Sequence, residues 1–125
     1  MRAMTLPTGN RMIRVLSALA AGLIVVQLLL LQEPAYAVRL VDATNDKLIH
    51  FVVFGAIAFF FWLATGGRWP LMVWAVVVLV GAIDETQQIQ TPGRTASIAD
   101  LAADGAGATA ALLILTAMNQ PKKED

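Results

Sequence analysis

The residues that could do chemistry in this chain gather in three short stretches, each beside a long apolar run. Their carboxylates and the single histidine could act as general bases or bind a cation, and the arginine could bind a phosphate or a carboxylate. The stretches contain Asp46, Lys47 and His50; Asp84, Glu85, Gln87 and Gln88; and Arg94, Asp100 and Asp104. Because the chain has no cysteine, thiolate metal sites and cysteine nucleophiles are excluded.

The spacing within each stretch places pairs of polar side chains on one helix face, because residues four apart are neighbours on a helix. These pairs are Asp46 with His50, Asp84 with Gln88, and Asp100 with Asp104. Gln87 and Gln88 are adjacent and cannot both face inward, so Gln88, on the face of Asp84, is the better candidate.

His50 and Glu85 are the candidate catalytic residues, each as a general base. For His50 the alternatives are metal ligation and simple hydrogen bonding within the packing, and a lone histidine is more often a packing residue. The carboxylates of the second and third stretches could hold a divalent cation through oxygen. No recognised metal-binding spacing is present, so we predict neither a metal site nor a cofactor. Arg94 could grip an anion or neutralise a neighbouring carboxylate.

The composition places these residues in a membrane protein. Of 125 residues, 58% are hydrophobic and only 14% are charged, whereas soluble domains carry about a quarter charged residues. The formal net charge is zero, which argues against nucleic acid as a partner because phosphate binding needs a basic face. We predict an all-α membrane protein with one domain, residues 1–125.

Four apolar runs predict a bundle of four transmembrane helices with short loops, since about 20 helical residues cross the hydrocarbon core. The predicted helices span about 13–31, 48–65, 69–88 and 98–118, and 119–125 form a polar tail. The third run is long enough only if it continues through Asp84, Glu85 and Gln88, which brings these side chains toward the membrane.

Local signals indicate how the helices begin and pack. Ser97 followed by Asp100 matches a capping box at the start of the fourth helix. A row of small residues four apart predicts a face that another membrane helix can approach closely. This row consists of Ala99, Ala103, Gly107 and Ala111. Trp62, Trp69 and Trp74 are most simply lipid-facing or interfacial anchors.

The basic residues predict that both termini are cytoplasmic, because cytoplasmic flanks are enriched in Lys and Arg. With four spanning helices, six of the nine basic residues lie on the N-terminal side of the membrane. Alternatively, residues 1–37 are a cleaved signal peptide ending in Ala35-Tyr36-Ala37, although the apolar run exceeds the ~7–15 residues usual for one. In both cases the three polar stretches lie at the outer face.

Ionisable side chains in a membrane cost about 2.5–3.5 kcal/mol each on insertion, so they face the bundle interior and find partners. We therefore predict one polar cluster, which is either a functional site or a network that joins helix ends. Its candidate binding residues are Asp46, Lys47, His50, Asp84, Glu85, Gln88, Arg94, Asp100 and Asp104.

Three sequence blocks resemble the VanZ-like family of small integral membrane proteins. They are D-K-x-x-H-F at 46–51, G-x-x-D-E-x-x-Q at 81–88, and P-G-R-T-A-S-x-x-D at 92–100 followed by D-G-x-G at 104–107. The blocks occur in the family's order, cover about residues 42–111, and are specific together rather than singly. The resemblance implies the fold, a place in the bacterial cell envelope and the importance of these residues. The family's name member is associated with low-level resistance to the glycopeptide teicoplanin.

One position departs from the family's pattern, which usually has asparagine where this chain has Asp104. The additional carboxylate is compensated if Asp104 carries a proton, or if Arg94 or Lys47 neutralises it. The departure puts in doubt any role that needs an amide at this position.

Three functions stay open. The first is a protein of the bacterial cytoplasmic (inner) membrane that binds a lipid headgroup or a lipid-linked envelope precursor. In it Arg94 and Lys47 hold the anion and the carboxylates hold a cationic group. The second is a membrane enzyme acting on such a lipid, and the third is a structural or partner-binding membrane subunit. Membrane lipids are the expected partners, and the oligomeric state is left open.

Overall fold

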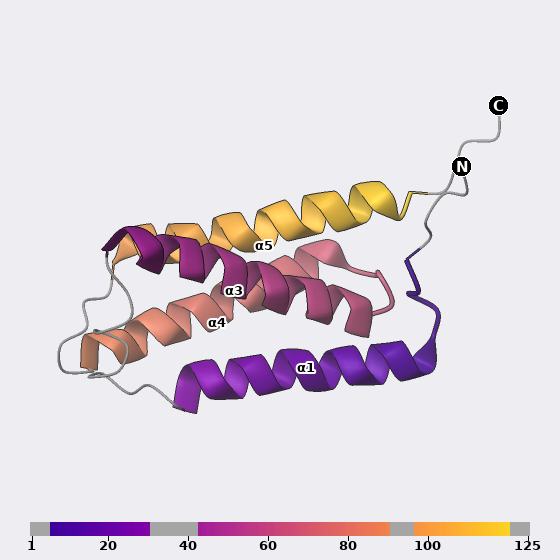
Figure 1. Ribbon diagram of the computed structural model, residues 1–125, viewed down its shortest axis with the longest axis horizontal. Coiled ribbons are helices and arrows are strands. Elements are labelled where there is room, and N and C mark those ends of the chain that lie inside the picture. Colours follow the sequence, from indigo (N-terminus) through magenta and orange to yellow (C-terminus); the bar gives the residue numbers. More distant parts are fainter. Residues whose placement is uncertain (1–5, 31–42, 91–96, 121–125) are drawn as a thin grey trace.

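Four helices, each antiparallel to the next along the chain, make up the described part of the computed structural model, which covers residues 6–30, 43–90 and 97–120 (Figure 1). They are α1 (Arg11–Leu30), α3 (Ala43–Ala64), α4 (Pro70–Gln90) and α5 (Ile98–Met118). Each helix is long and apolar enough to cross a membrane, and no strand occurs in these ranges. The predicted all-α bundle of four spanning helices is confirmed.

The helix ends show why the polar stretches lie on helices. α3 begins before the predicted residue 48, so Asp46 and Lys47 are helical residues. α4 begins at Pro70, whose fixed φ and missing N–H suit the first turn of a helix. It continues to Gln90, and this carries the polar end of the third apolar run into the same helix.

The most extensive helix pair is α3 with α5, and glycine allows their close approach. A Cβ atom at Gly107 would collide with the backbone oxygen of Phe51 and lie 3.0 Å from its Cα. A Cβ at Gly55 on α3 would lie 3.3 Å from the Gly107 oxygen. The predicted row of small residues therefore packs at Gly107, whereas Ala99, near the start of α5, is exposed.

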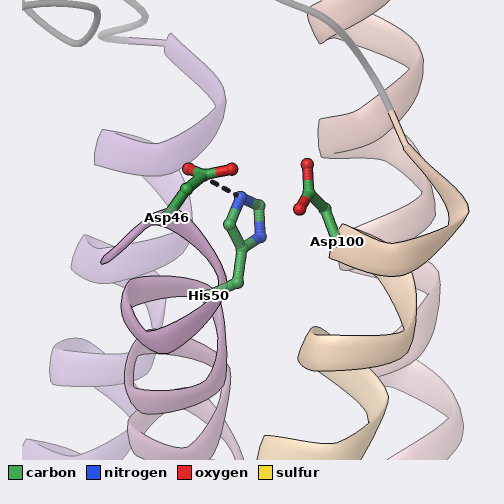
Figure 2. Close-up of side chains that lie close together, drawn as sticks. All are labelled: Asp46, His50 and Asp100. Atoms are coloured by element: carbon green, nitrogen blue, oxygen red, sulfur yellow. Dashed lines mark ion pairs between the residues drawn. The ribbon is translucent and has the colours of Figure 1, made fainter. Parts of the chain in front are cut away.

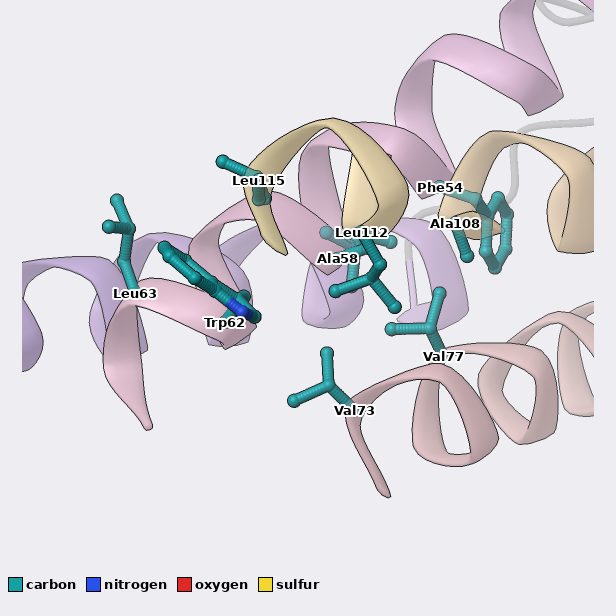
Figure 3. Packing of buried hydrophobic residues seen from close by; sticks show 10 residues of the cluster. Phe54, Ala58, Trp62, Leu63, Val73, Val77, Ala108, Leu112 and Leu115 are labelled. Atoms are coloured by element: carbon teal, nitrogen blue, oxygen red, sulfur yellow. The ribbon is translucent and has the colours of Figure 1, made fainter. Parts of the chain in front are cut away.

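An apolar core fills the bundle between α3, α4 and α5. Figure 3 shows its side chains converging from the three helices. The buried members are Phe54, Ile57, Ala58, Trp62, Leu63, Val73, Val77, Ala108, Leu112 and Leu115. The prediction that all three tryptophans are lipid-facing or interfacial is wrong for Trp62, which is fully buried. Trp69 and Trp74 are exposed at 62% and 37%, as the prediction requires.

The turn between α3 and α4 lies at the end of the bundle where α1 begins and α5 ends (Figure 1). Gly66 and Gly67 have φ angles of 71° and 74°, a conformation that glycine adopts at no steric cost. Their N–H groups donate to the last carbonyls of α3, and Arg14 donates from Nε to the oxygen of Ala64 at 3.2 Å. These hydrogen bonds terminate α3 and connect α1 to its last residue.

The outer surface of the bundle is rich in large apolar side chains. Leu19 and Leu23 on α1, Leu71 on α4 and Leu113 on α5 each expose more than half of their surface. Such side chains on membrane-spanning helices are suited to contact with lipid tails. Among the described residues, the charged side chains lie at the helix ends and in the interior of the bundle.

Candidate functional site

The polar side chains meet at the opposite end of the bundle, where α3 and α5 begin and α4 ends (Figure 1). We call this group the polar cluster. Its buried members are His50, Asp84, Glu85, Gln88, Asp100 and Asp104, with Asp46 and Lys47 at its edge. No buried member exposes more than 7% of its surface. The three polar stretches of the sequence thus come together in space.

His50 lies at the centre of the cluster. Its Nδ1 is 2.6 Å from Oδ1 of Asp104 on α5, and its Nε2 is 3.7 Å from Oδ1 of Asp46, one turn earlier on α3. Figure 2 shows the carboxylates of Asp46 and Asp100 on either side of the imidazole. The ring of Phe54 stacks nearly parallel to it, with centroids 6.2 Å apart. A hydrogen bond and a ring contact together fix the orientation of the imidazole.

The contact between His50 and Asp104 explains how the additional carboxylate is accommodated. Asp104 has no exposed surface, and a proton between the two side chains forms a charge-assisted hydrogen bond. The sequence offered Lys47 or Arg94 as the compensating group. Lys47 instead lies 3.4 Å from Asp100, and Arg94 lies outside the described residues.

Ser97 connects α4 and α5 through hydrogen bonds beside the polar cluster. Its hydroxyl oxygen accepts from the N–H of Asp100 at 3.0 Å, so it is the N-cap of α5. The predicted capping box is only half present, because the N–H of Ser97 donates to Oε2 of Glu85 at 3.0 Å rather than to Asp100. The carboxylate of Asp100 is therefore left for Lys47, whose side chain is 51% exposed.

Helix α4 supplies a second set of carboxylates. Nε2 of Gln88 donates to Oδ2 of Asp84 at 3.0 Å, which confirms the predicted pairing on one helix face. The other oxygen of Glu85, Oε1, is buried and has no hydrogen-bond partner among the described residues. A buried acceptor without a donor costs about 1–3 kcal/mol, so this oxygen is suited to a ligand.

Gly81 on α4 makes room for Asp104. A Cβ at this position would lie 2.7 Å from Oδ2 of Asp104 and 3.3 Å from Cε1 of Phe54. In the sequence, Gly81 stands out only as part of a family block, and nothing marks the backbone N–H of Ser97 as a site group. Both roles depend on which helices are neighbours, and no single-helix spacing reveals that.

The charges of the cluster do not balance within residues 6–30, 43–90 and 97–120. All the acidic residues in these ranges belong to the cluster, and Lys47 and His50 are the cationic or potentially cationic side chains beside them. The acidic residues are Asp46, Asp84, Glu85, Asp100 and Asp104. The described part of the cluster therefore favours a cationic group over an anion alone.

Two trios of potential metal ligands share His50. One is Asp46, His50 and Asp100, and the other is His50, Asp84 and Glu85; in each, one ligand atom per residue lies within 4.8 Å of the others. The sequence predicted no metal site because no known spacing is present. Each trio draws on two helices, so in each trio one ligand is far in the sequence from the other two. Binding or catalysis by these residues stays a prediction.

The comparisons with known proteins identify the family. The model of the VanZ/LLP1 family matches residues 9–119, a range that contains all four helices and every residue of the polar cluster. A search of the curated proteins found no match, and a search of the solved structures found none either. The resemblance of the three sequence blocks is therefore confirmed, and the chain belongs to the VanZ/LLP1 family as a multi-pass membrane protein.

Proposed function

We propose that this protein binds the polar headgroup of an envelope lipid, or of a lipid-linked envelope precursor, in the polar cluster. The observation that carries the proposal is the surplus of carboxylates over basic side chains among the described residues at one end of four membrane-spanning helices. A buried charge without a counter-charge costs several kcal/mol. Such a surplus is understandable where a cationic part of a ligand completes the site.

The proposed location is the outer face of the bacterial cytoplasmic membrane, with both termini in the cytoplasm. Arg11 and Arg14 lie in the first turn of α1 and Arg68 lies between α3 and α4, so all three are at the end of the bundle opposite the cluster (Figure 1). Lys47 is the one basic residue at the cluster end within the described ranges. Cytoplasmic flanks of membrane helices are enriched in Lys and Arg, which supports this orientation.

The chemistry of the cluster suits a zwitterionic headgroup with a primary ammonium beside a phosphate. Asp46 is partly exposed at the rim and, with Asp100, offers carboxylate oxygens to an ammonium group. Lys47 is half-exposed next to Asp100 and offers an ammonium to the phosphate. Arg94, outside the described residues, is the second candidate for the phosphate.

A membrane enzyme acting on such a lipid is the second candidate function, and the His50–Asp104 contact favours it. Asp104 holds Nδ1 and leaves Nε2 on the side of Asp46, an arrangement in which a carboxylate orients a histidine base. Glu85 is the other candidate base. In an enzyme, His50→Gln abolishes turnover of the bound lipid but leaves headgroup binding.

A purely structural or partner-binding subunit is less well supported. A network that only joins helices pairs its buried polar atoms, whereas Oε1 of Glu85 has no partner among the described residues. A role in glycopeptide (teicoplanin) resistance is part of the proposal only through the resemblance to the family's name member.

Native mass spectrometry of the full chain released from lipid nanodiscs tests the proposal. Phosphatidylethanolamine carries the primary ammonium, phosphatidylglycerol lacks a cation, and phosphatidylcholine has a cation without N–H donors. We expect retention of phosphatidylethanolamine to exceed that of the other two by about tenfold or more, since a charge-assisted hydrogen bond is worth about 1.5–3 kcal/mol.

Two variants make this experiment specific to the cluster. Asp46→Asn keeps the side-chain shape, removes one charge at the rim, and is expected to weaken the preference. Arg11→Gln, which changes an exposed charge at the other end of the bundle, is the control and is expected to leave it unchanged. Equal retention of the three lipids by the wild-type chain would reject the proposal.

A further inference from the structure

Three buried side chains of the polar cluster form a ligand set of the kind that holds a metal ion. His50 on α3 and Asp84 and Glu85 on α4 each offer one ligand atom, and these atoms lie within 4.8 Å of one another. All three residues are more than nine-tenths buried. Ligand atoms around a tetrahedral ion lie roughly 3.4 Å apart, so small side-chain rotations bring this set to binding distance.

Asp104 already prepares His50 for such a role. Its Oδ1 lies 2.6 Å from Nδ1 of His50, and Asp104 itself is fully buried. Metal-binding histidines almost always donate their other ring N–H to a carboxylate, a carbonyl or water, which fixes the tautomer and the ring orientation. With Nδ1 held in this way, Nε2 is the nitrogen left for an ion.

Glu85 supplies an independent indication of a ligand. Its Oε2 accepts from the N–H of Ser97 at 3.0 Å, whereas its Oε1 has no hydrogen-bond partner in the described ranges. The residue exposes only 7% of its surface, so water at the bundle surface does not readily satisfy that oxygen. One oxygen thus positions the carboxylate and the other is available, as in ligating carboxylates with outer-shell hydrogen bonds.

The other trio, Asp46, His50 and Asp100, is less suitable for an ion. Asp46 is partly exposed, and Asp100 already lies 3.4 Å from the ammonium of Lys47. That positive charge repels a nearby cation. Asp84 and Glu85 together carry two negative charges when ionised, which equal the charge of a divalent ion beside a neutral imidazole.

We propose that His50, Asp84 and Glu85 bind one divalent transition-metal ion of the Zn²⁺ or Mn²⁺ class, with Asp104 as the positioning residue for His50. One imidazole and two carboxylates suit these ions, whereas Mg²⁺ and Ca²⁺ prefer oxygen ligands alone. Three protein ligands leave a coordination position open. A headgroup phosphate is an anion that fits this position, and this last step alone rests on the proposed function.

Ion binding is measured on the purified full chain in detergent, without a histidine tag and without added lipid. After chelator treatment, calorimetric titration is expected to show one Zn²⁺ or Mn²⁺ per chain and no saturable binding of Mg²⁺. Glu85→Gln keeps the side-chain shape and is expected to lower the Zn²⁺ affinity by more than the about 10–100-fold typical of outer-shell changes. Asp104→Asn is expected to lower it within that range.

Matched variants decide between the two trios. Arg11→Gln, at the other end of the bundle, is the control and is expected to keep the wild-type affinity, whereas Asp46→Asn, in the alternative trio, is expected to lower the affinity less than Glu85→Gln does. A greater loss in Asp46→Asn than in Glu85→Gln would overturn the proposed ligand set. Circular dichroism and gel filtration confirm that each variant is folded before titration.

A spectroscopic signature tests the role of His50 directly. Pulsed electron paramagnetic resonance of the Mn²⁺-loaded chain is expected to show coupling to one imidazole ¹⁴N, and His50→Gln is expected to lose it. A wild-type spectrum without nitrogen coupling, or the absence of saturable binding, rejects the ion site. Since no lipid is present, that failure leaves headgroup binding untouched, and an ion site without headgroup selectivity would reject only the proposed function.

Discussion

The two ends of this bundle are built from the same helices but are held together in different ways. At the end where α3 turns into α4, Trp62, Val73 and Leu115 fill the interior with packed hydrocarbon (Figure 3). At the other end, the interior holds an imidazole and several carboxylates (Figure 2). The first end is determined by shape, and the second by the pairing of charges and hydrogen bonds.

The difference between the two ends bears on which residues serve stability and which serve function. Between membrane helices the stabilising contribution comes from close packing and hydrogen bonds, because lipid tails are as apolar as leucine. The apolar end satisfies this requirement without a ligand. The polar end leaves Oε1 of Glu85 unpaired among the described residues and a surplus of carboxylates. We infer that the apolar end supports the fold, whereas the polar end combines a stabilising His50–Asp104 pair with an unpaired Glu85 oxygen that is kept for binding.

Trp62→Ala is expected to produce the largest loss of stability, at the apolar end. Removing a buried tryptophan typically costs about 3–5 kcal/mol through lost contacts and the cavity left behind. Trp62→Phe is expected to be much milder, because Nε1 of Trp62 has no partner among the described residues and its removal strands nothing. Equilibrium unfolding in mixed micelles measures both losses of stability, and equal losses in the two variants would contradict this prediction.

His50→Ala is expected to cost nearly as much, at the polar end, because it leaves the Asp104 carboxylate buried without its partner. Breaking a buried pair by removing one member typically costs about 3–5 kcal/mol. The double variant His50→Ala, Asp104→Asn removes the stranded charge and is expected to be more stable than His50→Ala alone. The same unfolding assay gives the coupling between the two sites, and additive losses would rule out a direct interaction.

Gly107→Ala is expected to cause a smaller loss of stability. Gly107 lies in the α3–α5 contact, between the two ends of the bundle. The added methyl meets the backbone of Phe51, and overpacking of this kind typically costs about 1–3 kcal/mol. Gly105→Ala, two residues earlier, meets only Cγ2 of Val78 at 4.0 Å and is the control. It is expected to be neutral or slightly stabilising, and a similar loss in both variants would reject the close approach.

The sequence was sufficient to predict the membrane-spanning helices but not which helices contact one another. Apolar runs of about 20 residues determine spanning helices almost by length alone, and the polar stretches sit at their ends. The contact between His50 and Asp104 joins residues of different helices, and spacing along one helix cannot show it. The family resemblance indicated that these residues belong together without showing how.

Two local predictions were limited by tertiary context. Tryptophan is a residue type common in interfacial anchors, but Trp62 lies in the apolar core together with side chains of α4 and α5. Ser97 caps α5 as predicted, yet its own N–H is taken by Glu85 from the neighbouring helix. In both cases a contact between helices determined the outcome, where the sequence showed only the preference of one segment.

The central claim is that the Glu85 carboxylate, with one oxygen unpaired among the described residues, is kept for binding rather than for stability, and one thermal unfolding experiment on Glu85→Gln tests it most directly. The wild-type and variant chains are compared in detergent with chelator, with and without phosphatidylethanolamine. Residues kept for function often cost stability, so we expect the variant to unfold at or above the wild-type temperature and to gain less from the lipid. A variant that unfolds at a much lower temperature yet keeps the full response to lipid would contradict the claim and make the cluster structural.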